Sequence, residues 1–69
     1  MSYTERALRV KEVAEKLGVS ENFVWAKTDR GNVRHDPTFP RPFKLSGNAT
    51  AWLESEIDTW ILEKSRVRL

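Results

Sequence analysis

The chain of 69 residues carries 12 Lys and Arg against 10 Asp and Glu, so its formal net charge is +2, and 39% of its residues are hydrophobic. This length holds one small core and excludes two domains, and the composition is that of a folded protein. The absence of cysteine excludes disulfide bonds and cysteine-ligated zinc, and no apolar run approaches the roughly 18 residues of a membrane span.

The positive charge is concentrated in the upstream part of the chain. Residues 1–53 hold nine basic and six acidic side chains, whereas residues 54–69 hold three basic and four acidic ones. A net charge this small does not by itself indicate a polyanionic partner. Because residues 1–9 lack the apolar stretch of a signal peptide, we expect a cytoplasmic protein.

The first predicted helix covers residues 10–17. Its apolar residues recur at i, i+3, i+4 and i+7, as Val10, Val13, Ala14 and Leu17. This spacing is typical of an amphipathic helix that packs on one side. Gly18 follows directly and is expected to end the helix, because glycine adopts the left-handed conformation at little cost.

The second predicted helix covers residues 21–29 and follows a tight turn. Ser20 is a candidate N-cap, since its hydroxyl oxygen can accept a hydrogen bond from an amide two or three residues later. Gly31 is expected to end this helix in the way that Gly18 ends the first.

The two helices together have the residues that a helix-turn-helix needs, over about residues 10–30. Ala14 is small enough for the helices to cross closely, Gly18 permits the sharp turn, and Val24 holds the second helix against the first. Any compact pair of helices needs similar residues, so the pattern alone leaves DNA binding open.

A loop and a hairpin are predicted next. Residues 31–39 lack periodicity, and nearby prolines remove backbone donors. The hairpin is predicted over about residues 40–53, with a turn at Ser46-Gly47-Asn48. Alternation along the first arm directs Phe43 and Leu45 inward and the cations beside them outward.

The third predicted helix covers about residues 54–66. Leu53, Ile57, Trp60 and Ile61 share one face, and acidic residues come early and basic residues late, which suits the helix dipole. The order helix, helix, hairpin, helix predicts one α+β domain over residues 1–69, mostly α, with the fold of a small winged helix-turn-helix. Its expected core is Val13, Ala14, Leu17, Val24, Trp52, Ile57 and Trp60, with Trp25 the tryptophan least expected to be buried.

Three stretches resemble a known family, the AlpA-type phage and prophage regulators and excisionases. They are VKEVAEKLGVS at residues 10–20, FPRPFKL at residues 39–45 and WLESEIDTWI at residues 52–61. The resemblance implies a winged-helix fold similar to that of MerR-type activators. It also implies a regulator of a mobile element, or an excisionase that binds attachment-site DNA and assists a tyrosine integrase.

The chain departs from the family pattern at three places. On the second helix, Glu21, Phe23 and Ala26 stand where basic or small polar residues are usual. The hairpin tip has no arginine, and residues 32–38 resemble an insertion that brings Arg34 and His35. We expect this insertion to replace the missing cations.

Duplex DNA is therefore the expected partner. The candidate contacts on the second helix are Ser20, Asn22, Phe23, Lys27 and Arg30. The candidate contacts on the loop and hairpin are Arg34, Arg41, Lys44, Ser46 and Asn48. Asn22 can form two hydrogen bonds with adenine, and the cations can contact phosphates. The alternatives are a helix cap for Ser20, core packing for Phe23 and a solvated surface for the cations.

No enzyme, cofactor or metal site is expected, because no catalytic or metal-binding motif is present, and His35 is expected to be an ordinary surface residue. We expect a nucleoid-associated monomer that assembles cooperatively on DNA. Two alternatives stay open: an adaptor or anti-repressor that docks through the acidic third helix, and a nonspecific architectural DNA-binding protein.

Overall fold

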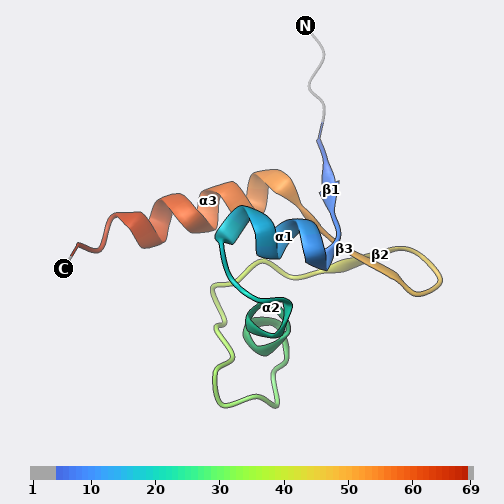
Figure 1. Cartoon of the computed structure of the whole chain (residues 1–69), viewed down its shortest axis with the longest axis horizontal. Coiled ribbons are helices and arrows are strands. Elements are labelled where there is room, and N and C mark those ends of the chain that lie inside the picture. The colour runs from blue at the N-terminus through green and yellow to red at the C-terminus, as the bar shows by residue number, and fades with distance from the viewer. Residues whose placement is uncertain (1–4, 69) are drawn as a thin grey trace, which may run out of the picture.

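The computed structural model describes residues 5–68 and has three helices and one antiparallel sheet of three strands (Figure 1). The elements in chain order are β1 (Ala7–Leu8), α1 (Val10–Leu17), α2 (Glu21–Thr28), β2 (Phe43–Ser46), β3 (Ala49–Leu53) and α3 (Glu54–Ser65). This arrangement confirms the predicted α+β class and the order of helices around the hairpin. In the described part of the chain, no helix has the length and apolar character needed to cross a membrane.

The turn between α1 and α2 forms as its residues predict. Gly18 has a left-handed φ of 72°, and its amide donates to the carbonyls of Ala14 and Glu15. The Ser20 hydroxyl oxygen accepts the Phe23 amide at 3.1 Å and so caps α2. The turn therefore fixes where α2 starts relative to α1.

The end of α2 differs from the prediction. The helix ends at Thr28, and Gly31 does not cap it, because Gly18 and Gly47 are the only described residues with a positive φ. The Asp29 carboxylate instead accepts the Gly31 amide at 2.9 Å. Such a local side-chain bond competes with helix continuation, so the chain leaves α2 earlier than its glycine suggested.

Strand β1 was not predicted, and it makes β3 the central strand. Leu8 of β1 pairs with Trp52 of β3, and the sheet order is β1-β3-β2. The hairpin turns at Gly47, whose φ is 45°. The prediction of a two-stranded sheet is therefore incomplete, because two residues are too few to show an alternating pattern.

The prediction that Phe43 and Leu45 point inward is wrong. Every residue of β2 is exposed, including Phe43 at 37% and Leu45 at 53%. The reason is position: β2 is an edge strand, and the hairpin extends beyond the helices (Figure 1). Alternation predicts which side chains share a face, but it does not say whether anything covers that face.

The core lies where α1, α2 and α3 meet β3. Five predicted residues are buried, namely Val13, Ala14, Val24, Trp52 and Ile57. Leu17 and Trp60, also predicted there, are only partly buried and pack against the cluster. Leu8, Phe39 and Ala51 are buried without having been predicted, since Leu8 enters through β1 and Phe39 packs edge-to-face on Trp60 at 5.0 Å.

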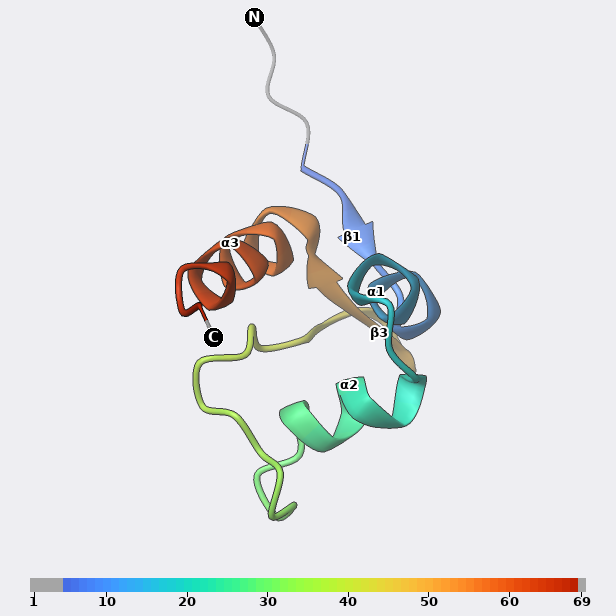
Figure 2. The same cartoon turned by 60° about the vertical axis from the view of Figure 1, so that its left-hand side comes forward.

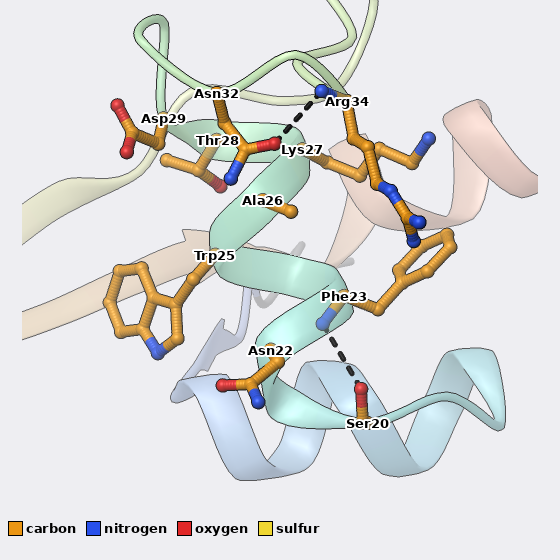
Figure 3. Close-up of a pocket in the computed structure, with 10 residues that line it drawn as sticks. All are labelled: Ser20, Asn22, Phe23, Trp25, Ala26, Lys27, Thr28, Asp29, Asn32 and Arg34. Atoms are coloured by element: carbon orange, nitrogen blue, oxygen red, sulfur yellow. Dashed lines mark hydrogen bonds between the residues drawn. The ribbon is translucent and has the colours of Figure 1, made fainter.

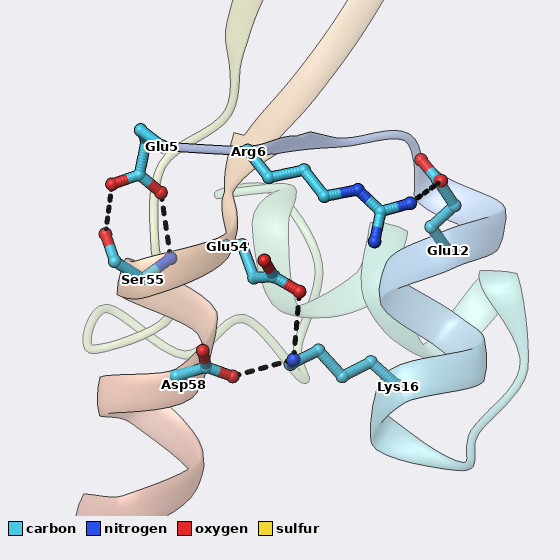
Figure 4. A network of polar contacts seen from close by, with 7 residues as sticks. All are labelled: Glu5, Arg6, Glu12, Lys16, Glu54, Ser55 and Asp58. Carbon is cyan, nitrogen blue, oxygen red and sulfur yellow. Dashed lines mark hydrogen bonds and ion pairs between the residues drawn. The ribbon is translucent and has the colours of Figure 1, made fainter. Parts of the chain in front are cut away.

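A polar network ties the start of α3 to the N-terminal segment (Figure 4). The Glu5 carboxylate accepts the Ser55 amide at 3.0 Å and the Ser55 hydroxyl at 2.8 Å. This carboxylate caps α3 from 50 residues away. Nearby, Lys16 pairs with Asp58 at 2.9 Å and Glu54 at 3.1 Å, and the hydrogen bonds to these two carboxylates raise the pKa of Lys16.

Candidate nucleic-acid interface

The face of α2 opposite the core is open. Val24 is fully buried, and with 3.6 residues per turn Asn22 and Ala26 lie on the other side of the helix. Figure 2 shows α2 on the side of the molecule away from α3. A helix held by one face and free on the other is the element that can enter a DNA groove.

Two aromatic side chains flank this open face (Figure 3). Phe23 lies on one side, with the Lys27 amino nitrogen 5.0 Å from its ring centroid. Trp25 lies on the other side, 42% exposed, with its ring centroid 5.5 Å from that of Trp52. The expectation that Trp25 is the least buried tryptophan is confirmed. Asn22 and Ala26 lie between the Phe23 and Trp25 rings.

A groove of about 710 Å³ runs along this face. Five predicted contacts line it, namely Ser20, Asn22, Phe23, Lys27 and Arg34. Arg34 comes from the segment after α2, and its side chain extends toward Phe23 in Figure 3. The structure therefore brings the inserted cation beside the residues of the second helix.

The segment that carries Arg34 is held by local hydrogen bonds. Asn32 Oδ1 accepts the Arg34 amide at 2.8 Å, and the Asp36 amide donates to the Lys27 carbonyl at 3.2 Å. The first bond shapes the turn, and the second fastens the segment to the end of α2. Asn32 also lines the groove, and its position depends on this loop rather than on any periodic pattern.

Asp36 joins the same segment to α3. Its carboxylate accepts the Thr38 hydroxyl at 2.6 Å and the Thr38 amide at 2.9 Å, and it pairs with Lys64 at 3.3 Å. These contacts, the Thr38 hydroxyl first, lower the pKa of Asp36 to about 2. The Trp60 indole N–H also donates to Thr38 Oγ1 at 3.2 Å, so the anchor includes the edge of the core.

We expect Asp36→Asn to lower the free energy of unfolding by about 1 kcal/mol near pH 7, because the amide keeps an acceptor but loses the charge. The pKa of Asp36 is lower in the folded protein than in the unfolded one. Its carboxylate therefore stabilises the folded protein at pH values above the unfolded pKa of 3.8, and this contribution is lost as pH falls through about 2. Urea unfolding of both proteins should therefore differ near neutral pH and converge near pH 2. Asp29→Asn is the matched control, and an equal loss in both variants would contradict the role of Asp36.

The other predicted contacts lie apart from the first groove. Arg30 lies beyond the end of α2, so the expectation that it shares that helix with Lys27 is wrong. Arg30 and Arg41 line a second groove between α2 and residues 35–42, which also includes Lys27. Lys44, Ser46 and Asn48 line neither groove and lie exposed on the hairpin.

His35 differs from its predicted state. It is half-buried and lines the second groove, and its Nδ1 is buried without a hydrogen-bond partner among the described residues. A lone histidine in a proline-rich loop gives no sequence signal for such a position. An unpaired buried polar atom is uncommon in folded proteins.

Two helices joined by a tight turn, an exposed second helix and an adjoining β-hairpin define the winged helix-turn-helix class. The chain belongs to the family described as "Prophage CP4-57 regulatory protein (AlpA)", whose profile matches residues 6–66. The resemblance to AlpA-type regulators is thereby confirmed.

Two similar proteins show the extent of the match. The chain is 29% identical over 62 residues to the "DNA-binding transcriptional activator AlpA" of Escherichia coli (strain K12), covering 90% of this chain and 89% of that protein. It is 35% identical over 57 residues to the "Uncharacterized protein ORF88" of Enterobacteria phage P4, covering 83% of this chain and 58% of that protein. No solved structure matches the chain.

Proposed function

We propose that this protein is a sequence-specific double-stranded DNA-binding regulator of a phage or prophage. The observation that carries the proposal is that the basic side chains around α2 and the hairpin form no ion pair with an acidic residue. Within residues 5–68, Lys16 of α1, Lys64 of α3 and Arg66 just after α3 have acidic partners, whereas Arg9, Lys11 and Arg68 lie singly outside the α2 region without an ion pair. The cations around α2, the following segment and the hairpin form no ion pair there, and these are Lys27, Arg30, Arg34, Arg41 and Lys44.

In the proposed complex, α2 enters the major groove. Asn22 reads a base edge, Phe23 contacts a thymine methyl, and Ser20 approaches the backbone at the start of the helix. The unpaired cations contact phosphates, and the hairpin with Ser46 and Asn48 lies against the adjacent backbone or minor groove.

The net charge of +2 supports a specific reader over a nonspecific architectural protein. Binding that depended on phosphates alone would favour a larger excess of Lys and Arg. The open face of α2 instead combines an amide, a small side chain and two aromatic rings, and this mixture can distinguish base edges. The name of the Escherichia coli relative, a DNA-binding transcriptional activator, supports the same function.

We extend the proposal to the setting in which the protein acts. It works in the cytoplasm at the nucleoid, as a transcription regulator or as an excisionase that assists a tyrosine integrase, without enzymatic activity or cofactor. It is a monomer that assembles cooperatively on adjacent sites. A stable dimer in sedimentation without DNA would contradict that last point, and an excision assay separates the two roles.

The test of DNA binding compares two duplexes of equal length by fluorescence anisotropy. One carries the DNA upstream of the protein's own gene and the attachment site of the element, and the other is scrambled. We expect binding to the native duplex to persist to higher salt than binding to the scrambled one. Equal binding at every salt concentration would favour an architectural protein, and no binding to either would favour the adaptor that docks through α3.

A further inference from the structure

The second groove, between the end of α2 and residues 35–42, has the chemistry of an anion site. Its volume is about 610 Å³. Basic side chains reach it from α2, from the turn after α2 and from the approach to β2, as Lys27, Arg30 and Arg41. Each of them lacks an ion pair within residues 5–68.

The acidic groups around this groove are already engaged. Asp29 lines it, and the Asp29 Oδ1 accepts the Gly31 amide at 2.9 Å. Asp36, next to His35, is bonded to Thr38 and paired with Lys64 of α3. Neither carboxylate forms an ion pair with a cation of the groove, and the three cations that line it outnumber its one lining carboxylate, Asp29, so the groove keeps a net positive charge.

Two of the carbonyl groups in the last turn of α2, which carries the negative end of the helix dipole, accept hydrogen bonds from residues beyond the helix. The Thr28 hydroxyl donates to the Val24 carbonyl at 2.9 Å. The Asp29 amide donates to the Trp25 carbonyl at 2.9 Å, and the Asp36 amide donates to the Lys27 carbonyl at 3.2 Å. These donors reduce the repulsion that an anion would meet at a helix C-terminus.

His35 lines the groove beside these cations. Its Nδ1 is buried without a partner, whereas its Nε2 is not among the buried unpaired atoms and makes no hydrogen bond within residues 5–68. We assign a proton to Nε2, because it is the ring nitrogen that is not buried and can donate to a ligand in the groove.

We propose that this groove binds a phosphate group of the DNA backbone, held by the His35 Nε2–H and by Arg30 and Arg41. The inference rests on the proposed DNA binding and gives residues 32–38 a role in it. Lys27 lines both grooves, so the phosphate site continues directly from the open face of α2. A phosphate seated there fixes the depth at which Asn22 meets the bases.

The first test uses the fact that the chain has one histidine, so its ring gives a single set of NMR signals. We expect the ring signals to show a proton on Nε2. We also expect the ring signals to shift when inorganic phosphate or the native duplex is added, and not when chloride is added at the same ionic strength. Ring signals that move with neither phosphate nor duplex would overturn the proposal.

The second test measures duplex affinity in variants. His35→Ala should weaken binding to the native and scrambled duplexes by the same factor, about three- to tenfold, because one hydrogen-bond donor to the phosphate is lost. Arg41→Ala should weaken both and reduce the salt slope by about 1. His35→Gln keeps an amide N–H near the position of Nε2 and should bind nearly as the native protein does.

The outcomes separate this inference from the proposed function. If the native protein binds the duplex and His35→Ala binds it with equal affinity, the phosphate site is wrong but DNA binding still stands. If the native protein binds neither duplex, the proposed function is wrong. The ring signals in inorganic phosphate then show whether the groove binds an anion. If His35→Ala fails to fold, the ring signals of the native protein decide the matter.

Discussion

Replacing Trp52 with alanine is expected to unfold most of the protein at room temperature. Trp52 is fully buried on the central strand, where it pairs with Leu8 and contacts the Trp25 ring. Removing a buried tryptophan side chain costs about 3–5 kcal/mol, and a core in a chain this short supplies roughly 3–5 kcal/mol in total. Circular dichroism and urea unfolding should show little cooperative structure in the variant.

Trp25→Ala is the matched control, because it removes the same side chain at the exposed end of the same ring pair. Trp25 is 42% exposed, so we expect a loss of about 1 kcal/mol and a folded protein. Equal destabilisation by the two substitutions would contradict the assignment of Trp52 as the centre of the core. Because Trp25→Ala is expected to stay folded, it can also be used to measure whether the Trp25 ring, at the edge of the open face of α2, contributes to DNA binding.

The second large effect is expected for Asn22→Ala on the choice of DNA. The side chain lies on the open face of α2, and a bidentate amide contact with adenine discriminates by about 1–3 kcal/mol. The variant should lose affinity for the native duplex by that amount and keep its affinity for the scrambled one. Its stability should be unchanged, because Asn22 is exposed and its side chain forms no hydrogen bond within residues 5–68.

Lys44→Ala tests the complementary contact. Its amino group donates to Thr50 Oγ1 at 3.0 Å across the hairpin, which holds the charge on the exposed strand. We expect weaker binding to both duplexes by the same factor and a salt slope smaller by about 1. Arg66→Ala removes one charge at the far end of α3 and serves as the control. If Asn22→Ala and Lys44→Ala behave identically on both duplexes, the proposed division between base and backbone contacts is wrong.

The sequence predicts local features of this fold well, because their causes lie within a few residues. The stripe ending at Leu17, the glycine after it and the cap at Ser20 each depend on neighbours along the chain. The end of α2 lies within one residue of the prediction, but Gly31 does not form it, because the Asp29 side chain accepts the Gly31 amide instead. The burial of Phe43 was misjudged because it depends on what covers the strand.

The candidate site is predictable only in part for the same reason. The helical repeat places Asn22 opposite Val24, and the structure agrees. Nothing periodic, however, indicates that residues 29–38 fold back onto α2, because side-chain bonds within turns fix that path. The sequence therefore identified Arg34 as a candidate by its charge, but it gave no reason to place His35 in a groove.

The cap that Glu5 provides for α3 and the pairing of Leu8 with Trp52 have a consequence for synthesis on the ribosome. The helix-turn-helix is made first, yet the side chains on which it packs, Trp52 and Ile57, come from the last third of the chain. Contacts of such long sequence separation close late. We therefore expect the open face of α2 to become ordered only once β3 and α3 are available for packing, and a chain that stops before α3 to lack a stably folded helix-turn-helix.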